Sequence, residues 1–153
     1  MCNKRDLMRI VIQRVESAKV EVDGKTVGSI GKGALVLFGV HKDDAPAQTL
    51  WLANKLVNLR MFADALDKMN LSLLDIKGEV LIVSQFTLYG NCSEGRRPEF
   101  TASAPPALAN SLYEKFILEV RQQNLNVQTG VFGARMKVSL VNDGPVTFIL
   151  DAK

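Results

Sequence analysis

The chain has 153 residues, 47% of them hydrophobic, and predicts one domain over residues 8–153 after a tail of residues 1–7. Its formal charge of +3 allows a polyanionic partner without requiring one. Cys2 and Cys92 have no second Cys or His at metal-ligand spacing, which argues against a disulfide framework and structural zinc and indicates a reducing, cytoplasmic setting. Neither an export signal nor an apolar run of membrane-spanning length is present, so we expect no membrane association.

The N-terminal segments predict a β-hairpin. Apolar residues alternate partly over residues 9–15 and cleanly over 18–22, a period typical of strands. Asp23-Gly24 then precedes another strand-like run, residues 25–30. Because Asp-Gly between two such runs favours a two-residue turn, we expect the runs to pair.

A central strand and a helix follow. ALVLFGV, residues 34–40, is apolar on both faces, which predicts a strand covered on both sides. Leu52, Leu56 and Leu59 then recur at spacings of three and four after Pro46. This stripe is typical of an amphipathic helix with proline near its start, which would lie on the sheet.

The second half alternates between strands and one further helix. EVLIVSQFTL, residues 79–88, predicts a buried strand that turns polar at Ser84, and a loop rich in Gly, Arg and Pro follows it. A second amphipathic stripe is formed by Leu112, Tyr113, Phe116, Ile117 and Val120. The order predicts a mixed α/β (α+β-like) single domain, with largely antiparallel β-sheets, a barrel-like core and two packed helices. A regular βαβα repeat fits poorly, because the helices come singly between groups of strands.

The stretch VSLVNDGPVTFIL, residues 138–150, is strand-like at both ends and contains a proline, which removes a backbone donor from any strand pairing. Asp143-Gly144 between apolar runs favours a hairpin turn. Alternatively, Gly144-Pro145 is a rigid dipeptide presented to another molecule. The local sequence leaves both interpretations open.

The single histidine, His41, follows the strand at 34–40 and precedes a polar loop, so we expect it to be an exposed loop residue. It would have to serve as the base of any Ser-His or Cys-His site. We therefore expect no histidine triad, no metal and no cofactor.

A first candidate site is SQFTL, where Ser84, Gln85 and Thr87 place polar groups at the end of an apolar strand. Either the strand simply leaves the core, or its backbone amides converge there as an oxyanion hole. Strand alternation puts Gln85 and Thr87 on one face and Ser84 and Phe86 on the other. Their side chains could converge only if the strand ends or bulges.

Two glycine-containing loops are further candidates. In GRRPEF, Arg96 and Arg97 either bind phosphate or form a solvated turn. In TGVFGARM, residues 129–136, the chain either makes a plain turn or approaches a ligand through two glycines and two apolar surfaces, Gly130, Gly133, Phe132 and Met136.

From Met8 to its C-terminus, the sequence resembles the D-aminoacyl-tRNA deacylases, hydrolases that remove D-amino acids from tRNA. The two signatures of that family stand here as SQFTL at 84–88 and NDGPVT at 142–147. IQRV, VDG, KMN followed by SLLD, and GRRPEF keep the order and spacing of the family.

The resemblance implies a homodimer acting on aminoacyl-tRNA in translation proofreading, with Gly144 and Pro145 joined by a cis peptide and inserted into the partner's site. This filter would reject L substrates and admit glycine, as in glycyl-tRNA mischarged on tRNA(Ala). Catalysis would fall to the SQFTL segment, through Ser84, Gln85, Phe86 and Thr87, with backbone amides around Gln85 and Phe86 holding the ester oxygen. The 2′-hydroxyl of the terminal ribose would assist, and the terminal adenosine would lie on Phe132, Gly133 and Met136.

Two other hypotheses remain at this point. The same fold could be a non-catalytic module that binds acylated tRNA ends. Alternatively, Thr87 could act as a covalent nucleophile, although the sequence offers no base for it. The preferred D-amino acids and tRNAs are not encoded in any recognisable motif.

Overall fold

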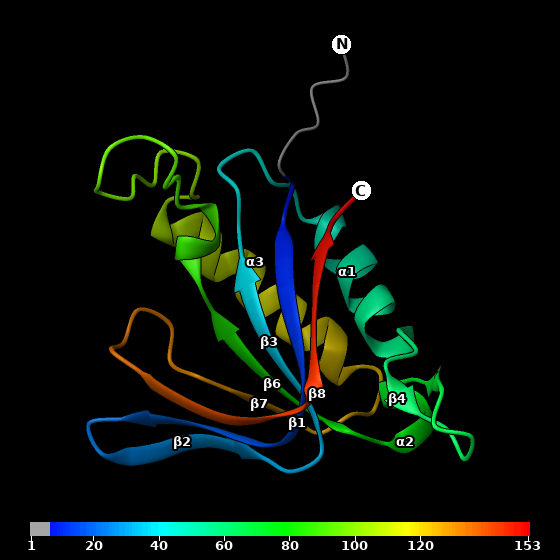
Figure 1. The fold of residues 1–153 in the computed structure, drawn as a ribbon. Helices are drawn as coiled ribbons and strands as arrows, with labels where there is room; N and C mark the ends of the chain where they lie inside the picture. Colours follow the sequence, from blue (N-terminus) through cyan, green and yellow to red (C-terminus); the bar gives the residue numbers. More distant parts are fainter. Residues whose placement is uncertain (1–6) are drawn as a thin grey trace.

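A strongly curved six-stranded sheet carries the fold in the computed structural model, which describes residues 7–153 (Figure 1). The order of the strands along the sheet is β2-β1-β3-β6-β7, and β8 pairs with β1 as well. Their bounds are Arg9–Val22 (β1), Lys25–Ile30 (β2), Gly33–Gly39 (β3), Glu79–Ser84 (β6), Val127–Thr129 (β7) and Lys137–Asp151 (β8). The predicted tail falls mostly on residues 1–6, which lie outside the described residues.

The predicted hairpin is confirmed, but the two strand segments before it form one long strand. β1 pairs antiparallel with β3 over Arg9–Val15 and with β2 over Ala18–Val22. The turn residues Asp23 and Gly24 have φ angles of 50° and 78°, as a two-residue turn between twisted strands requires. β1 therefore passes from one partner to another along its length, and the sheet bends there.

The middle of the sheet is parallel, which the sequence did not predict. β3 pairs with β6 and β6 with β7, both in parallel. Each connection runs through a helix, α1 (Ala47–Asn58) and α3 (Pro106–Arg121). Parallel neighbours require such a crossover. The prediction of a mixed α/β domain with largely antiparallel pairing holds, because β1 pairs antiparallel with β2, β3 and β8.

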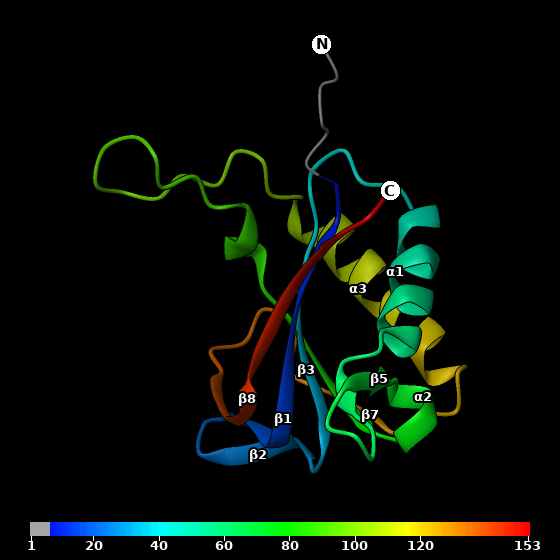
Figure 2. The ribbon, with the colours of Figure 1, turned by 45° about the vertical axis from the view of Figure 1, so that its right-hand side comes forward.

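Helices cover one face of β3 and β6, and the curled hairpin covers the other. Val36 and Phe38 of β3 pack with α1 and α3 in the main core, while Leu35 faces a second cluster with Val20 and Leu81. β2 closes against β7 so tightly that a Cβ on Gly28 would lie 2.5 Å from the Thr129 carbonyl oxygen. These contacts make the sheet barrel-like, as predicted (Figures 1 and 2).

Smaller elements complete the chain. The two predicted helices are α1 and α3, and a four-residue helix, α2 (Leu73–Ile76), is added where Ser72 and Asp75 form a capping box. A short ribbon pairs β4 (Phe62–Ala63) with β5 (Met69–Leu71), and η1 (Phe86–Tyr89) is a turn of 3₁₀-helix. No helix within residues 7–153 has the length and apolar character needed to span a bilayer.

The hairpin interpretation of residues 138–150 is wrong, because β8 runs through the NDGP segment as one strand. Val15 of β1 pairs with Asn142, and Gln13 pairs with Thr147. The four residues 143–146 therefore stand opposite Arg14 alone. The segment is a bulge of four residues opposite one, and the chain continues in the same direction on both sides of it.

Candidate active site

A cavity of about 640 Å³ opens where the parallel strands end. Its walls come from the end of β3, from the segment after β6 and from the segment after β7, which are represented by Val40, Phe86 and Phe132. Parallel strands direct their carboxyl ends to the same edge of a sheet, and ligands commonly bind in the crevice there. The predicted residues Ser84, Gln85, Phe86, Phe132, Gly133 and Met136 all line this cavity.

The SQFTL segment changes from strand to helix inside the cavity. Ser84 is the last residue of β6, and the Gln85 amide donates to the Phe38 carbonyl at 2.8 Å, which extends the pairing by one residue. The chain then turns into η1. The strand alternation that would have separated these side chains ends at Ser84, so residues 84–86 can share one cavity.

Two backbone amides at the start of η1 are available to a ligand. Within residues 7–153, the amides of Phe86 and Thr87 donate to no protein acceptor. The Gln85 amide is already occupied by Phe38. Helix starts leave such donors unsatisfied, and here Phe86 lines the cavity and Thr87 follows it directly in the chain. The predicted pair of donors around Gln85 and Phe86 therefore has one amide that is already bonded, at Gln85, and one that is open, at Phe86.

Thr87 is exposed, and its hydroxyl accepts a hydrogen bond from the Gln85 side-chain amide. In the described part of the chain, no carboxylate or imidazole bonds to it. Thr87 is also not among the residues that line the cavity. A threonine held in this way lacks the adjacent base that a nucleophile needs.

An aromatic pair frames the mouth of the cavity. Phe86 and Phe100 are 54% and 39% exposed, and their rings meet edge to face at 5.1 Å. The Ser103 hydroxyl donates to the Phe86 carbonyl at 3.0 Å and fixes the turn. We did not predict Phe100 or Ser103. The apolar Phe100 in an otherwise polar loop was the signal that could have identified this contact.

The opposite wall follows β7. Phe132 packs against Tyr113 of α3 with ring centroids 5.9 Å apart, and the Tyr113 hydroxyl donates to the Ile82 carbonyl at 2.7 Å. Burial raises the pKa of Tyr113 to about 12, so this residue remains a neutral donor. Gly133 has a φ of 76°, which favours glycine, and its exposed backbone leaves the wall open.

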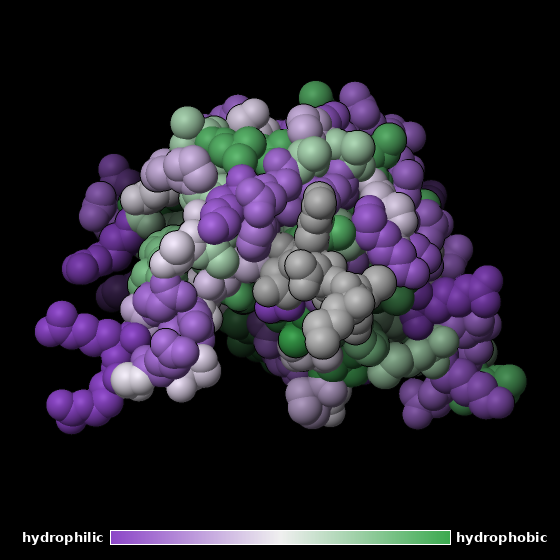
Figure 3. Space-filling view, turned by 90° about the horizontal axis from the view of Figure 1, so that it is seen from above, coloured by the Kyte–Doolittle hydropathy of each residue, from purple (hydrophilic) through white to green (hydrophobic). Residues whose placement is uncertain are grey.

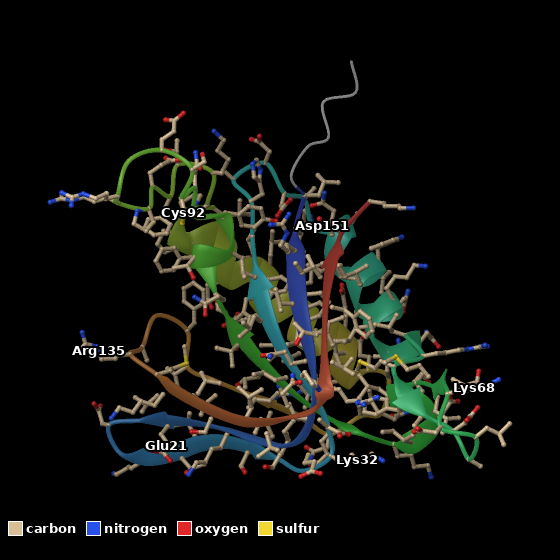
Figure 4. All side chains as sticks on the ribbon, viewed as in Figure 1. Glu21, Lys32, Lys68, Cys92, Arg135 and Asp151 are labelled. Carbon is tan, nitrogen blue, oxygen red and sulfur yellow. The ribbon has the colours of Figure 1, made fainter. Side chains whose placement is uncertain are left out.

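Arg96 and Arg97 do not line the cavity. They are exposed at the tip of a loop whose base is closed by paired backbone hydrogen bonds between Asn91 and Glu99, at 2.8 and 3.0 Å. This loop stands away from the body of the molecule (Figures 1 and 2), and Phe100 and Ser103, which follow it, line the cavity. From above, hydrophilic side chains project on that same side (Figure 3). Cys92 of the loop and the outward-pointing Arg135 mark this side of the molecule in Figure 4.

Gly144 and Pro145 are exposed and do not line the cavity. The peptide bond between them is cis, as the resemblance implied. Arg14, which the sequence did not single out, holds the bulge: its guanidinium donates to the carbonyls of Asp143 at 3.0 Å and Met61 at 2.8 Å. Asn142 bridges the bulge by accepting from the Val146 amide at 2.8 Å.

His41 does not take part in the cavity. The prediction of an exposed histidine is wrong, because its side chain is only 12% exposed, and its ring meets Tyr89 edge to face at 5.5 Å. Its Nδ1 accepts from the Asp43 amide at 3.1 Å. Among residues 7–153, no group of His, Cys, Asp and Glu side chains is arranged to hold a metal ion.

The fold and the cavity together define a mixed α/β domain with a solvent-open site at the ends of parallel strands. The family model described as D-Tyr-tRNA(Tyr) deacylase matches residues 11–151. The chain is 63% identical over 146 residues to the D-aminoacyl-tRNA deacylase of Thermosipho africanus, covering 95% of this chain and 98% of that one. It is 62% identical over 144 residues to the protein of that name from Geotalea uraniireducens, with coverages of 94% and 93%. The chain belongs to the D-Tyr-tRNA(Tyr) deacylase family.

Two solved structures share the whole fold. A protein titled c-Myc DNA Unwinding Element Binding Protein superposes with a TM-score of 0.88 at 36% identity, over 95% of this chain and 99% of that one. A probable eukaryotic D-amino acid tRNA deacylase superposes with a TM-score of 0.84 at 20% identity, over 94% and 98%. The second likeness shows the fold alone.

Proposed function

We propose that this protein hydrolyses the ester bond of D-aminoacyl-tRNA and releases the free D-amino acid and tRNA in the cytoplasm. The observation that carries the proposal is the cavity itself. In a chain closely similar to curated deacylases, it joins the SQFTL segment to the Phe132–Met136 wall. A 640 Å³ cavity is within the usual range for a small-molecule site and suits an aminoacyl adenosine.

The chemistry follows from which groups the cavity supplies. The amides of Phe86 and Thr87 hold the oxyanion that forms when water attacks the ester carbonyl, and such preorganised donors stabilise the transition state. The described residues place no base beside Thr87, so the 2′-hydroxyl of the terminal ribose assists the attack. Gln85 orients the substrate, and the Thr87 hydroxyl holds the Gln85 side chain by accepting from its amide. Ser84 is the last residue of β6, so the chain turns into η1 directly after it.

The terminal adenosine lies against the wall that follows β7. Phe132 and Met136 supply apolar surface for the base, and Gly133 lets the backbone approach it. Aromatic and apolar side chains hold unstacked bases in this way. Arg96 and Arg97, on the loop that stands beside the cavity mouth, contact phosphates of the acceptor stem.

The Gly144-Pro145 bulge acts as the chiral filter in the partner's cavity. Its exposure, its place outside its own cavity and its anchoring by Arg14 support this role. Rigid carbonyl groups at the α-carbon leave no space for an L side chain, whereas a D side chain points elsewhere. Glycine lacks a side chain and passes the filter, so glycine mischarged on tRNA(Ala) is also a substrate.

A homodimer is required by this arrangement. Within the described chain, β8 pairs with β1 alone, so its other edge is open, and Val141 and Ile149 on it are 51% and 67% exposed. Open strand edges with apolar side chains are typical of surfaces that pair with another chain. Light scattering should give twice the 16.8 kDa mass of one chain, and a monomer at micromolar concentration would contradict the filter in trans.

The test of the function is multiple turnover. D-tyrosyl-tRNA is incubated with a small fraction of its molar amount of protein, and the free tyrosine is counted. Hydrolysis of many equivalents supports the proposal. Binding of one equivalent without release would instead identify a non-catalytic module that holds acylated tRNA ends.

A further inference from the structure

A second groove, of about 430 Å³, lies behind the adenosine wall. Phe132 lines both the groove and the active-site cavity, so the two spaces are neighbours across one aromatic side chain. The groove runs between α3 and the end of β7, where Thr129, the last residue of β7, and Gly130 form its other side. If the last unit of a polymer binds in the cavity, the unit before it can lie in this groove.

The α3 side of the groove carries polar groups that the protein does not use. Asn110, Glu114 and Arg121 line it at spacings of four and seven residues, which places them along one face of the helix. Within residues 7–153, the side chains of Asn110 and Glu114 make no hydrogen bond or ion pair. Leu118, 56% exposed, lies between Glu114 and Arg121 and offers an apolar surface.

The charges of the groove are separated along its length. Glu114 and Arg121 are seven residues apart, a rise of about 10 Å along a helix, and they do not pair with each other. The Arg121 guanidinium donates to the Val127 carbonyl at 3.3 Å, which holds it at this end, and its other N–H groups bond to no acceptor in the described part of the chain. An acceptor for a base edge therefore lies at one end and a donor for a phosphate at the other.

We infer that this groove binds the nucleotide that precedes the terminal adenosine, and that it selects a cytosine base. The inference rests on the proposed function, which places the adenosine on Phe132. Cytosine presents an N4 amino donor, which the Glu114 carboxylate accepts, and Asn110 reaches the neighbouring acceptors of the same edge. Pro106 and Ala109 of α3 line the cavity, so Arg121, the last residue of α3, lies at the remote end of the groove and holds the phosphate on the 5′ side of this nucleotide, while the base lies over Leu118. A uracil would place its O4 acceptor against the carboxylate and be disfavoured.

The test uses short substrates, the D-tyrosyl esters of adenosine, CpA and UpA. For the wild-type protein, the KM for the CpA ester should be about tenfold lower than for the UpA ester, because one good base contact discriminates by about 1–3 kcal/mol. Glu114→Gln should reduce this ratio to near one, since an amide can donate to uracil O4. Asp67→Asn, at an exposed turn outside both cavities, removes one negative charge as a matched control and should keep the wild-type ratio.

Calorimetry with the dinucleotides CpA and UpA that carry no amino acid separates this inference from the proposed function. A preference for CpA that Glu114→Gln abolishes supports the groove even if no ester is hydrolysed, in which case the deacylase proposal alone fails. Equal affinities of the wild-type protein for CpA and UpA, or a preference that survives in Glu114→Gln, would overturn the assignment.

Discussion

Arg14→Lys tests whether the guanidinium that holds the Gly144-Pro145 bulge also controls selectivity. Arg14 donates to two carbonyl groups from different segments, Asp143 and Met61, and its Nε lies 3.5 Å from an Asp143 carboxylate oxygen. The side chain is 14% exposed, so water replaces these bonds poorly. A lysine keeps the charge, but its single ammonium cannot serve both carbonyls with the fork geometry of arginine.

We expect Arg14→Lys to lower the free energy of unfolding by the worth of one hydrogen bond to a charged group, about 1.5–3 kcal/mol. For a chain of this size, each kcal/mol lowers Tm by about 2–4 °C, so we expect a fall of about 3–12 °C by calorimetry. Arg60→Lys is the matched control. The exposed Arg60 makes one contact at 3.5 Å, to Asn70, and the change should stay within about 0.5 kcal/mol.

The functional consequence is a misplaced filter. Displacement of a positioning group by about 1 Å can change rates by about 100-fold, so L-aminoacyl-tRNA should be hydrolysed measurably faster relative to its D counterpart. Initial rates with matched D- and L-tyrosyl-tRNA, at a temperature where the variant is folded, give the ratio. A variant with the wild-type Tm and the wild-type ratio would refute this role of Arg14.

Three other predictions concern the chemistry and the fold. Thr87→Ala should lower the rate less than about tenfold, because in the proposed mechanism the hydroxyl only supports the Gln85 side chain and does not attack the ester. A trapped acyl group on Thr87 would reverse this view. A substrate ending in 2′-deoxyadenosine should react at least about 100-fold more slowly. Full activity on this substrate would show that the ribose 2′-hydroxyl takes no part in the reaction. Burial raises the pKa of Asp44, whose carboxylate accepts from the Met8 and His41 amides at 2.9 and 2.6 Å. The folded state therefore binds this proton more tightly. The stabilisation that Asp44 gives is complete below its pKa of about 3.8 in the unfolded chain and is lost as pH rises through its raised pKa in the folded protein. The unfolding free energy of the wild type minus that of Asp44→Asn, measured with urea, should show this decline, because carboxyls with lowered pKa values, such as Asp64 and Asp75, are common to both proteins and cancel. Asp44→Asn should itself lower the unfolding free energy by about 1–3 kcal/mol, because its side-chain amide brings N–H donors next to the backbone N–H donors.

Much of the fold was readable because local patterns agreed with tertiary packing. The turn at Asp23-Gly24, the covered strand at 34–40 and the helix after Pro46 appear as predicted. The parallel pairing was missed, because each helix lies between two strands that were assigned to separate antiparallel groups. Residues 33–84 contain a strand, a helix and a second strand, and both strands are apolar on both faces. This order was the signal that could have predicted a parallel pair.

The site residues were readable only in part. The end of the strand at Ser84 was a local signal, because polar groups replaced apolar ones there. The bulge at Asp143 was not, since a turn sequence is equally compatible with a hairpin, and only the pairing of β1 with both halves of β8 excludes it. Arg14 could not be identified, because its partners lie 47 and 129 residues away in sequence. Contacts of that range depend on the whole topology.

The most direct test of the central claim compares the initial rates of deacylation of D-tyrosyl-tRNA and L-tyrosyl-tRNA, prepared on the same tRNA, at catalytic amounts of protein. The account predicts repeated turnover of the D ester, while the L ester decays no faster than it does without protein. Equal rates on the two esters, or no turnover of the D ester by the folded protein, would contradict it.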